Sequence, residues 1–179
     1  AGARPIYERL LHLAETSVPP DSLRLGIALL GLANVVSDLG DYPRGLGLYE
    51  RALAVREALH GPRSARVGMT LQSMASLAEV MHDPVQEERY VRRAREAFEG
   101  SVGPAHPQTA EITVNLAVTL WKLGRNDAAF EEAILGERLT REHMRRTARG
   151  LSAADALQYE TTRAEGLSLA LELAGHAPS

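Results

Sequence analysis

A spacing of 42 residues recurs along this 179-residue chain and limits its possible folds more than any other feature. The landmarks that share the interval are Leu32-Ala33, Met74-Ala75 and Leu116-Ala117; Leu39-Gly40, Met81-His82 and Leu123-Gly124; Gly61-Pro62 and Gly103-Pro104; and Tyr7-Glu8-Arg9 and Tyr49-Glu50-Arg51. A fixed period in this range indicates an array of similar supersecondary units, each too small to bury its own apolar face.

Each period is predicted to form two helices. In the third copy, apolar residues step by four, four and three residues, the spacing of one helical face: Ile112, Leu116, Leu120 and Leu123. Gly124 follows them, where a helix commonly ends in a left-handed residue. In the first copy, Pro43 suits the first turn of a second helix and Gly61-Pro62 ends it.

The period and its breaks give the expected domain organisation. An array over residues 1–149 contains a half repeat at 6–17 and helix pairs at about 21–60, 64–101 and 106–148, and a non-repeating tail covers 150–179. Ala and Leu are abundant and aromatic residues make up only 4%, which favours an all-α fold. In the tail, Leu157, Leu167 and Leu171 fall on one stripe of a predicted final helix, expected to cap the apolar face of the last repeat.

Composition excludes several classes of function. The chain contains no cysteine, so it has no disulfide, thiolate metal site or cysteine nucleophile. A net charge of −3 provides no overall basic field for nucleic acid. No apolar run approaches the ~18 residues of a membrane span. We therefore expect a cytoplasmic protein without a membrane or nucleic-acid partner.

The titratable residues form no pattern typical of catalysis or metal binding. None of the six histidines pairs with a second histidine at i, i+4. Residues 45–47, Gly-Leu-Gly, lack the third glycine and the preceding strand of a phosphate loop. We therefore expect no enzyme activity, metal or cofactor. A basic stripe of Arg138, Arg141, Arg145 and Arg149 is either a solvated helix face or a docking surface for an acidic partner.

The order Leu-Ala, Leu-Gly-x-Tyr, Tyr-x-Arg-Ala-Leu-Ala and Gly-Pro within residues 32–62 resembles a tetratricopeptide repeat. The 42-residue period and Ala-His-Pro-Gln-Thr-Ala at 105–110 are similar to the long-helix variant of kinesin light chains and many bacterial proteins. This resemblance implies a right-handed superhelical solenoid of antiparallel helix pairs. The second copy departs from the pattern, with His82, Pro84 and Glu87 replacing the usual Gly, Tyr and Ala. A HEAT or armadillo array is the alternative of similar period.

The resemblance also implies a function, a non-catalytic scaffold that binds protein or peptide in a concave groove lined by the first helix of each pair. The implied groove residues are Asn34 and Asp38 in the first copy, Gln72, Ser76 and Glu79 in the second, and Asn115, Val118, Trp121 and Lys122 in the third. Polar side chains there are expected to hydrogen-bond a peptide backbone. Trp121, the only tryptophan, either stacks on the partner or packs against the neighbouring helix.

Residues 139–171 carry a second resemblance, to the spacer that joins such repeats to the caspase-like CHAT protease domain of bacterial proteins. It implies that the chain is the sensor or scaffold part of a larger bacterial protein with an attached protease domain.

The alternative to a peptide-binding scaffold is a structural array without a peptide ligand, which self-associates weakly through an end face or the arginine stripe.

Overall fold

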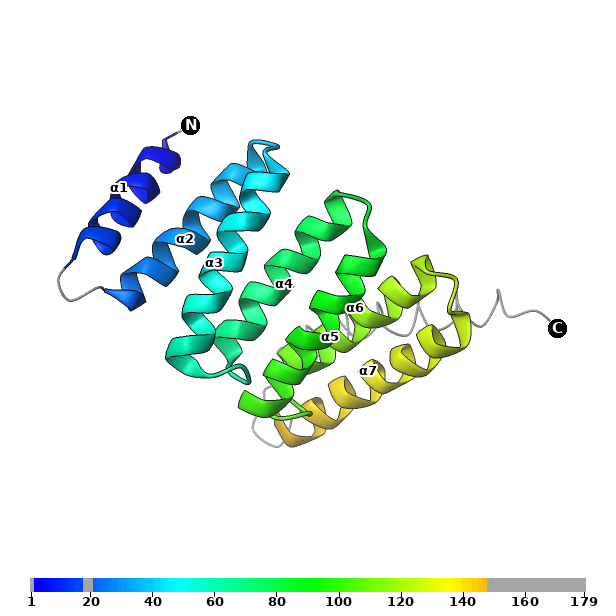
Figure 1. Cartoon of the computed structure of the whole chain (residues 1–179). Helices are drawn as coiled ribbons and strands as arrows, with labels where there is room; N and C mark the ends of the chain where they lie inside the picture. The colour runs from blue at the N-terminus through cyan, green and yellow to red at the C-terminus, as the bar shows by residue number, and fades with distance from the viewer. Residues whose placement is uncertain (1, 18–20, 148–179) are drawn as a thin grey trace. The chain divides into compact units, whose positions relative to one another are not determined.

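A computed structural model describes residues 2–17 and 21–147 of the chain. These residues form seven α-helices and no strand (Figure 1): α1 (Ala3–Thr16), α2 (Ser22–Asp38), α3 (Tyr42–His60), α4 (Ala65–Val80), α5 (Pro84–Ser101), α6 (Pro107–Lys122) and α7 (Asn126–Thr147). The all-α prediction is confirmed. The expected final helix at 150–179 lies outside the described residues, as does Arg149 of the arginine stripe.

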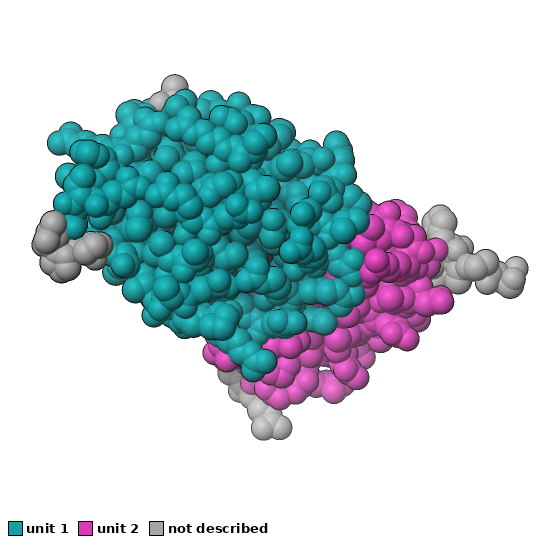
Figure 2. Space-filling model, viewed as in Figure 1, with its two compact units in different colours: residues 1–97 teal, residues 98–179 magenta. Residues whose placement is uncertain are grey.

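The chain divides into two compact units, coloured separately in Figure 2. Unit 1 covers residues 1–97 and includes α1 to α4 with most of α5. Unit 2 covers residues 98–179 and includes α6 and α7. The predicted boundaries at residues 149 and 150 stay a prediction.

In unit 1, α2 and α3 form an antiparallel pair because only three residues, 39–41, connect them (Figure 1). Buried Leu32 and Val36 of α2 and Ala52 of α3 belong to the core of this unit. The Asp41 carboxylate caps α3 by accepting the Arg44 amide at 3.4 Å, and Pro43 lies in the first turn. The sequence signals for the start of this helix are therefore confirmed.

The turn between the two helices of each pair needs a left-handed residue. Gly40 and Gly124 supply it with φ of 87° and 72°. His82, at the same repeat position, has φ of 56°. A left-handed conformation places a Cβ too close to the following carbonyl, so the histidine strains a turn that glycine would make freely.

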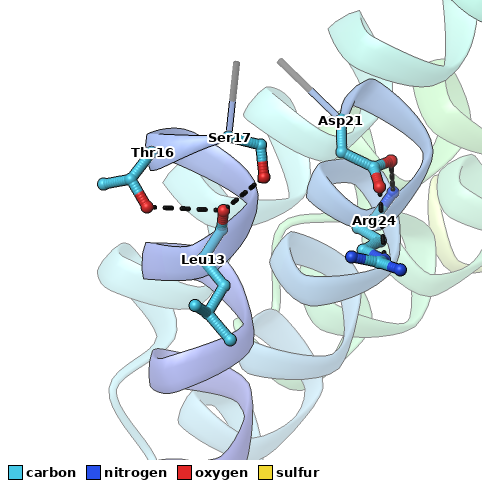
Figure 3. A network of polar contacts seen from close by, with 5 residues as sticks. All are labelled: Leu13, Thr16, Ser17, Asp21 and Arg24. Atoms are coloured by element: carbon cyan, nitrogen blue, oxygen red, sulfur yellow. Dashed lines mark hydrogen bonds and ion pairs between the residues drawn. The ribbon is translucent and has the colours of Figure 1, made fainter. Parts of the chain in front are cut away.

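Side chains cap the helix ends on both sides of residues 18–20 (Figure 3). The Leu13 carbonyl, near the end of α1, accepts hydrogen bonds from the hydroxyls of Ser17 at 2.7 Å and Thr16 at 3.4 Å. Asp21 is the N-cap that precedes α2, and its carboxylate accepts the Arg24 amide at 2.9 Å and pairs with the Arg24 guanidinium at 3.2 Å. These groups satisfy helix-end carbonyls and amides that have no partner inside the helix.

Ion pairs connect successive second helices of unit 1. Glu15 of α1 pairs with Arg51 of α3 at 2.6 Å, and Glu57 of α3 pairs with Arg93 of α5 at 2.7 Å. Both pairs join residues 36 apart, and the second pair lies 42 residues after the first. We call these two contacts the ion-pair ladder.

Unit 2 contains the antiparallel pair α6 and α7. His106 precedes α6, and its Nδ1 accepts the Gln108 amide at 3.3 Å, so this histidine caps the helix. The predicted apolar stripe of α6 is buried at three of its four positions, Ile112, Leu116 and Leu120, and partly exposed at Leu123.

Candidate functional site

Two of the implied groove residues, Asn34 and Asp38, lie on α2 and are exposed to solvent. They are four residues apart, so their side chains lie on one face of the helix. In unit 1, α3 packs against both α2 and α4, the two first helices. The two first helices of unit 1 therefore pack against the same second helix, α3.

Asn34 is held by a buried tyrosine. The hydroxyl of Tyr49, on α3, donates a hydrogen bond to Asn34 Oδ1 at 2.6 Å. Burial raises the pKa of Tyr49, and the Asp38 carboxylate adds to the increase. The phenol therefore stays protonated at neutral pH and remains a donor. Because the amide oxygen of Asn34 accepts this bond, the amide NH₂ group is left to donate elsewhere.

Asp38 is the last residue of α2. The carbonyl end of a helix carries partial negative charge, which disfavours a carboxylate there by about 0.3–1 kcal/mol. No ion pair to Asp38 occurs within the described part of the chain. The position is therefore electrostatically unfavourable for the isolated chain.

The implied groove residues of the second copy lie on α4. Ser76 and Glu79 are exposed, and Gln72 is partly exposed. The Ser76 hydroxyl donates to the Gln72 carbonyl at 3.2 Å, so it offers a partner its oxygen lone pairs.

Sequence analysis missed two exposed apolar residues of the same helices. Ile27 on α2 is 45% exposed and Met69 on α4 is 50% exposed. They occupy equivalent positions, 42 residues apart, and precede Asn34 and Ser76 by seven residues, about two helical turns. The 42-residue period could have identified this pair, because it places Ile27 and Met69 at the same repeat position.

The four implied groove residues of unit 2 lie on α6. Trp121 and Lys122 are exposed, whereas Asn115 and Val118 are partly exposed. Trp121 keeps 44% of its surface open. This exposure leaves aromatic surface available to a partner, so packing on a neighbouring helix does not occupy the whole ring.

Over residues 2–17 and 21–147, no group of three or more His, Asp or Glu side chains could hold a metal ion. None of the helices in these ranges is both long and apolar enough to cross a membrane.

Comparisons with known proteins identify the fold. The tetratricopeptide repeat family matches residues 24–100. A search of curated proteins gave no match. Among solved structures, the chain is similar to BtubC (BKLC) from P. vanneervenii, with a TM-score of 0.71 and 18% identity, over 96% of this chain and 67% of the other. Residues 24–100 are therefore similar to tetratricopeptide repeats, as the pattern in residues 32–62 predicted.

Proposed function

We propose that the chain is a non-catalytic scaffold that binds a protein or peptide along its first helices. Tetratricopeptide repeats are generally protein-interaction scaffolds. In unit 1 the proposed binding surface, here called the first-helix face, consists of Ile27, Asn34 and Asp38 of α2 with Met69, Ser76 and Glu79 of α4. Gln72 of α4 lies beside it.

One observation carries this proposal, the matched chemistry of the two helices. Ile27 and Met69 are exposed apolar residues at equivalent repeat positions, and Asn34 and Ser76 are exposed polar residues at equivalent repeat positions. Exposed apolar side chains with polar neighbours are typical of interaction surfaces. The repeated arrangement favours a ligand that contacts both repeats.

In unit 2, the proposed contacts are Trp121 and its neighbours Asn115, Val118 and Lys122 on α6. Tryptophan is enriched among the residues that dominate binding energy, because one side chain buries a large apolar area. Its 44% exposed surface is available for such a contact.

Selection from a random peptide library displayed on phage would test the proposal with the whole chain. We expect enriched peptides whose affinity falls at least tenfold in Asn34→Ala or in Trp121→Ala. Phe130→Ala is a matched control, because Phe130 is an exposed aromatic residue on the second helix α7. Peptides that bind all three variants equally would contradict the proposal.

A finer proposal concerns an attached domain. The resemblance of residues 139–171 to a spacer supports regulation of a CHAT protease domain by partner binding. Residues 148–171 lie outside the described part, so the proposal rests on sequence. The residues that follow Ser179 in the full-length gene product would test it, and a downstream region without a His/Cys protease domain would contradict it.

Self-association is the competing proposal. It is supported by the exposed arginines of α7, among them Arg138, Arg141 and Arg145. Sedimentation velocity across the micromolar range would separate the two, since a strict monomer throughout rejects self-association.

A further inference from the structure

We infer that the first-helix face of unit 1 selects a cationic segment: an extended peptide in which a Lys or Arg lies about four to five residues from an apolar side chain. The inference rests on the proposed function and specifies the chemistry of its ligand. It comes from the order of apolar, amide and carboxylate groups along α2.

The apolar end of the ligand is placed by Ile27 and Met69. Each side chain leaves about half of its surface open, 45% and 50%. A peptide side chain that covers either of them would remove apolar surface from water, at about 25 cal/mol per Å². The preferred residue is therefore Leu, Ile, Met or Phe.

The cationic end of the ligand is placed by Asp38. Its carboxylate lacks an ion pair among the described residues and lies at the helix end where α2 itself disfavours negative charge. A ligand cation would offset both effects. The cation at the other end of α2, Arg24, already pairs with Asp21, so its charge is partly neutralised. Asp38 is therefore the uncompensated charge of this helix face.

Asn34 lies between these two ends and has a fixed orientation. Because the Tyr49 hydroxyl bonds to Asn34 Oδ1, the amide NH₂ is oriented as a donor. A donor suits a main-chain carbonyl of an extended ligand. Tyr49 is therefore a positioning residue, because it acts on the ligand only through Asn34.

The helix geometry sets the spacing of the ligand. Asp38 follows Ile27 by eleven residues, which corresponds to about 16 Å along an α-helix at 1.5 Å per residue. An extended peptide spans about 3.3 Å per residue, so five residues cover the distance. The long stem of Lys or Arg allows four.

The equivalent face of α6 in unit 2 has different chemistry. Glu111 stands where unit 1 has Ile27 and Met69, and Lys122 stands where unit 1 has Asp38. Lys122 would repel a ligand cation at the position where Asp38 attracts one. The inferred preference for a cationic ligand therefore belongs to unit 1.

The test uses the phage selection described above, now read for sequence. We expect the enriched peptides to carry Lys or Arg four or five residues from an apolar residue. Synthetic versions of these peptides should bind Asp38→Lys at least tenfold more weakly than the original chain and Asp38→Asn about threefold more weakly. Tyr49→Phe should weaken their binding as much as Asn34→Ala does. Glu50→Lys is the matched charge control, because Glu50 is an exposed acid of the second helix α3.

The outcomes separate the inference from the proposed function. Two results would overturn the inference and leave the proposed function standing. In the first, the peptides lose affinity in Asn34→Ala and Met69→Ala but carry no cation. In the second, they bind Asp38→Lys with unchanged affinity. A selection without any peptide that depends on the first helices would overturn both. Circular dichroism of each variant shows whether lost binding reflects lost folding.

Discussion

The ion pairs described for α3 and for α7 differ in which helices they join. In unit 1, the ion-pair ladder connects separate helices, with Glu15 to Arg51 at 2.6 Å and Glu57 to Arg93 at 2.7 Å. In unit 2, the pairs described on α7 are local, four residues apart: Glu137 with Arg141 and Glu142 with Arg146. The ladder therefore joins different helices, whereas the two pairs described on α7 stay within one helix.

The difference follows from single residues. Leu135 occupies the position of Arg51 and Arg93, so α7 lacks the cation of the ladder. Arg141 occupies the position of Glu57, so the sign is reversed there as well. A repeat can keep its helices and lose its surface chemistry, because helix formation depends on the apolar face.

The largest expected effect comes from a core position at which the units differ. Arg56 in unit 1 is 9% exposed, whereas Phe98 in unit 2 occupies the equivalent position and is fully buried. Arg56 Nη1 donates to the Arg66 carbonyl at 3.0 Å and the Thr70 hydroxyl at 2.9 Å. Arg56→Ala is expected to lower the free energy of unfolding by about 2–4 kcal/mol, because it leaves a cavity and removes both bonds.

Urea unfolding followed by circular dichroism measures this effect. Arg56→Met should stay within about 1 kcal/mol of the original chain, because methionine fills a similar volume without a buried charge. Arg9→Ala, on the exposed face of α1, is the surface control. A methionine variant as unstable as the alanine variant would show that the guanidinium, with its charge and its two hydrogen bonds, is required.

The next effect tests the packing of α6 on α7. A Cβ at Gly136 would lie 2.7 Å from Val114 Cγ2, whereas the equivalent residue of unit 1, Ala52, is accommodated and fully buried. Gly136→Ala should destabilise the chain by about 1–3 kcal/mol through overpacking. Adding Val114→Ala should recover part of this loss. A double variant as unstable as the sum of both single variants would contradict the direct contact.

The turn at His82 provides a stabilising change. His82→Gly should raise the free energy of unfolding by about 1 kcal/mol, because glycine adopts the left-handed conformation of Gly40 and Gly124 without a Cβ clash. His82→Ala is the control, since it removes the imidazole and keeps the clash. Equal stabilisation by both substitutions would assign the effect to the imidazole.

The smallest expected effects come from the ion-pair ladder and from the local pairs of α7. Arg51→Gln should destabilise by at most about 1 kcal/mol, and Arg141→Gln by about 0.3–0.5 kcal/mol. Both effects should disappear near 1 M salt, where the screening length is about 3 Å. Thermal melts at low and high salt measure them. Only Arg51→Gln should also loosen α1, seen as faster hydrogen exchange, and unchanged exchange would argue against a tertiary role for the ladder.

Sequence reasoning predicted the fold well because a repeated pattern states the same information several times. The period located the helix pairs, and local signals such as Pro43 and Gly61 located helix ends. These features depend on residues close together in the chain.

The candidate site was predicted less completely because exposure depends on tertiary packing. The nine implied groove residues stay a prediction, and their exposure ranges from partial to high. Ile27 and Met69 were missed because an apolar residue on an apolar helix is expected to be buried. The orientation of Asn34 was not predictable either, since it depends on Tyr49, fifteen residues away.

The ladder has a consequence for how such an array could grow by duplication. One helix, α3, carries both Arg51, which pairs with the preceding second helix, and Glu57, which pairs with the following one. This helix therefore carries one charged contact for each of its two neighbours. A tandem copy of the 42-residue repeat that contains α3 would pair Glu57 with the copied Arg51, so the contact between the copies needs no further mutation. In α7, Leu135 and Arg141 occupy the positions of Arg51 and Glu57, so a repeat added after α7 would need new contacts.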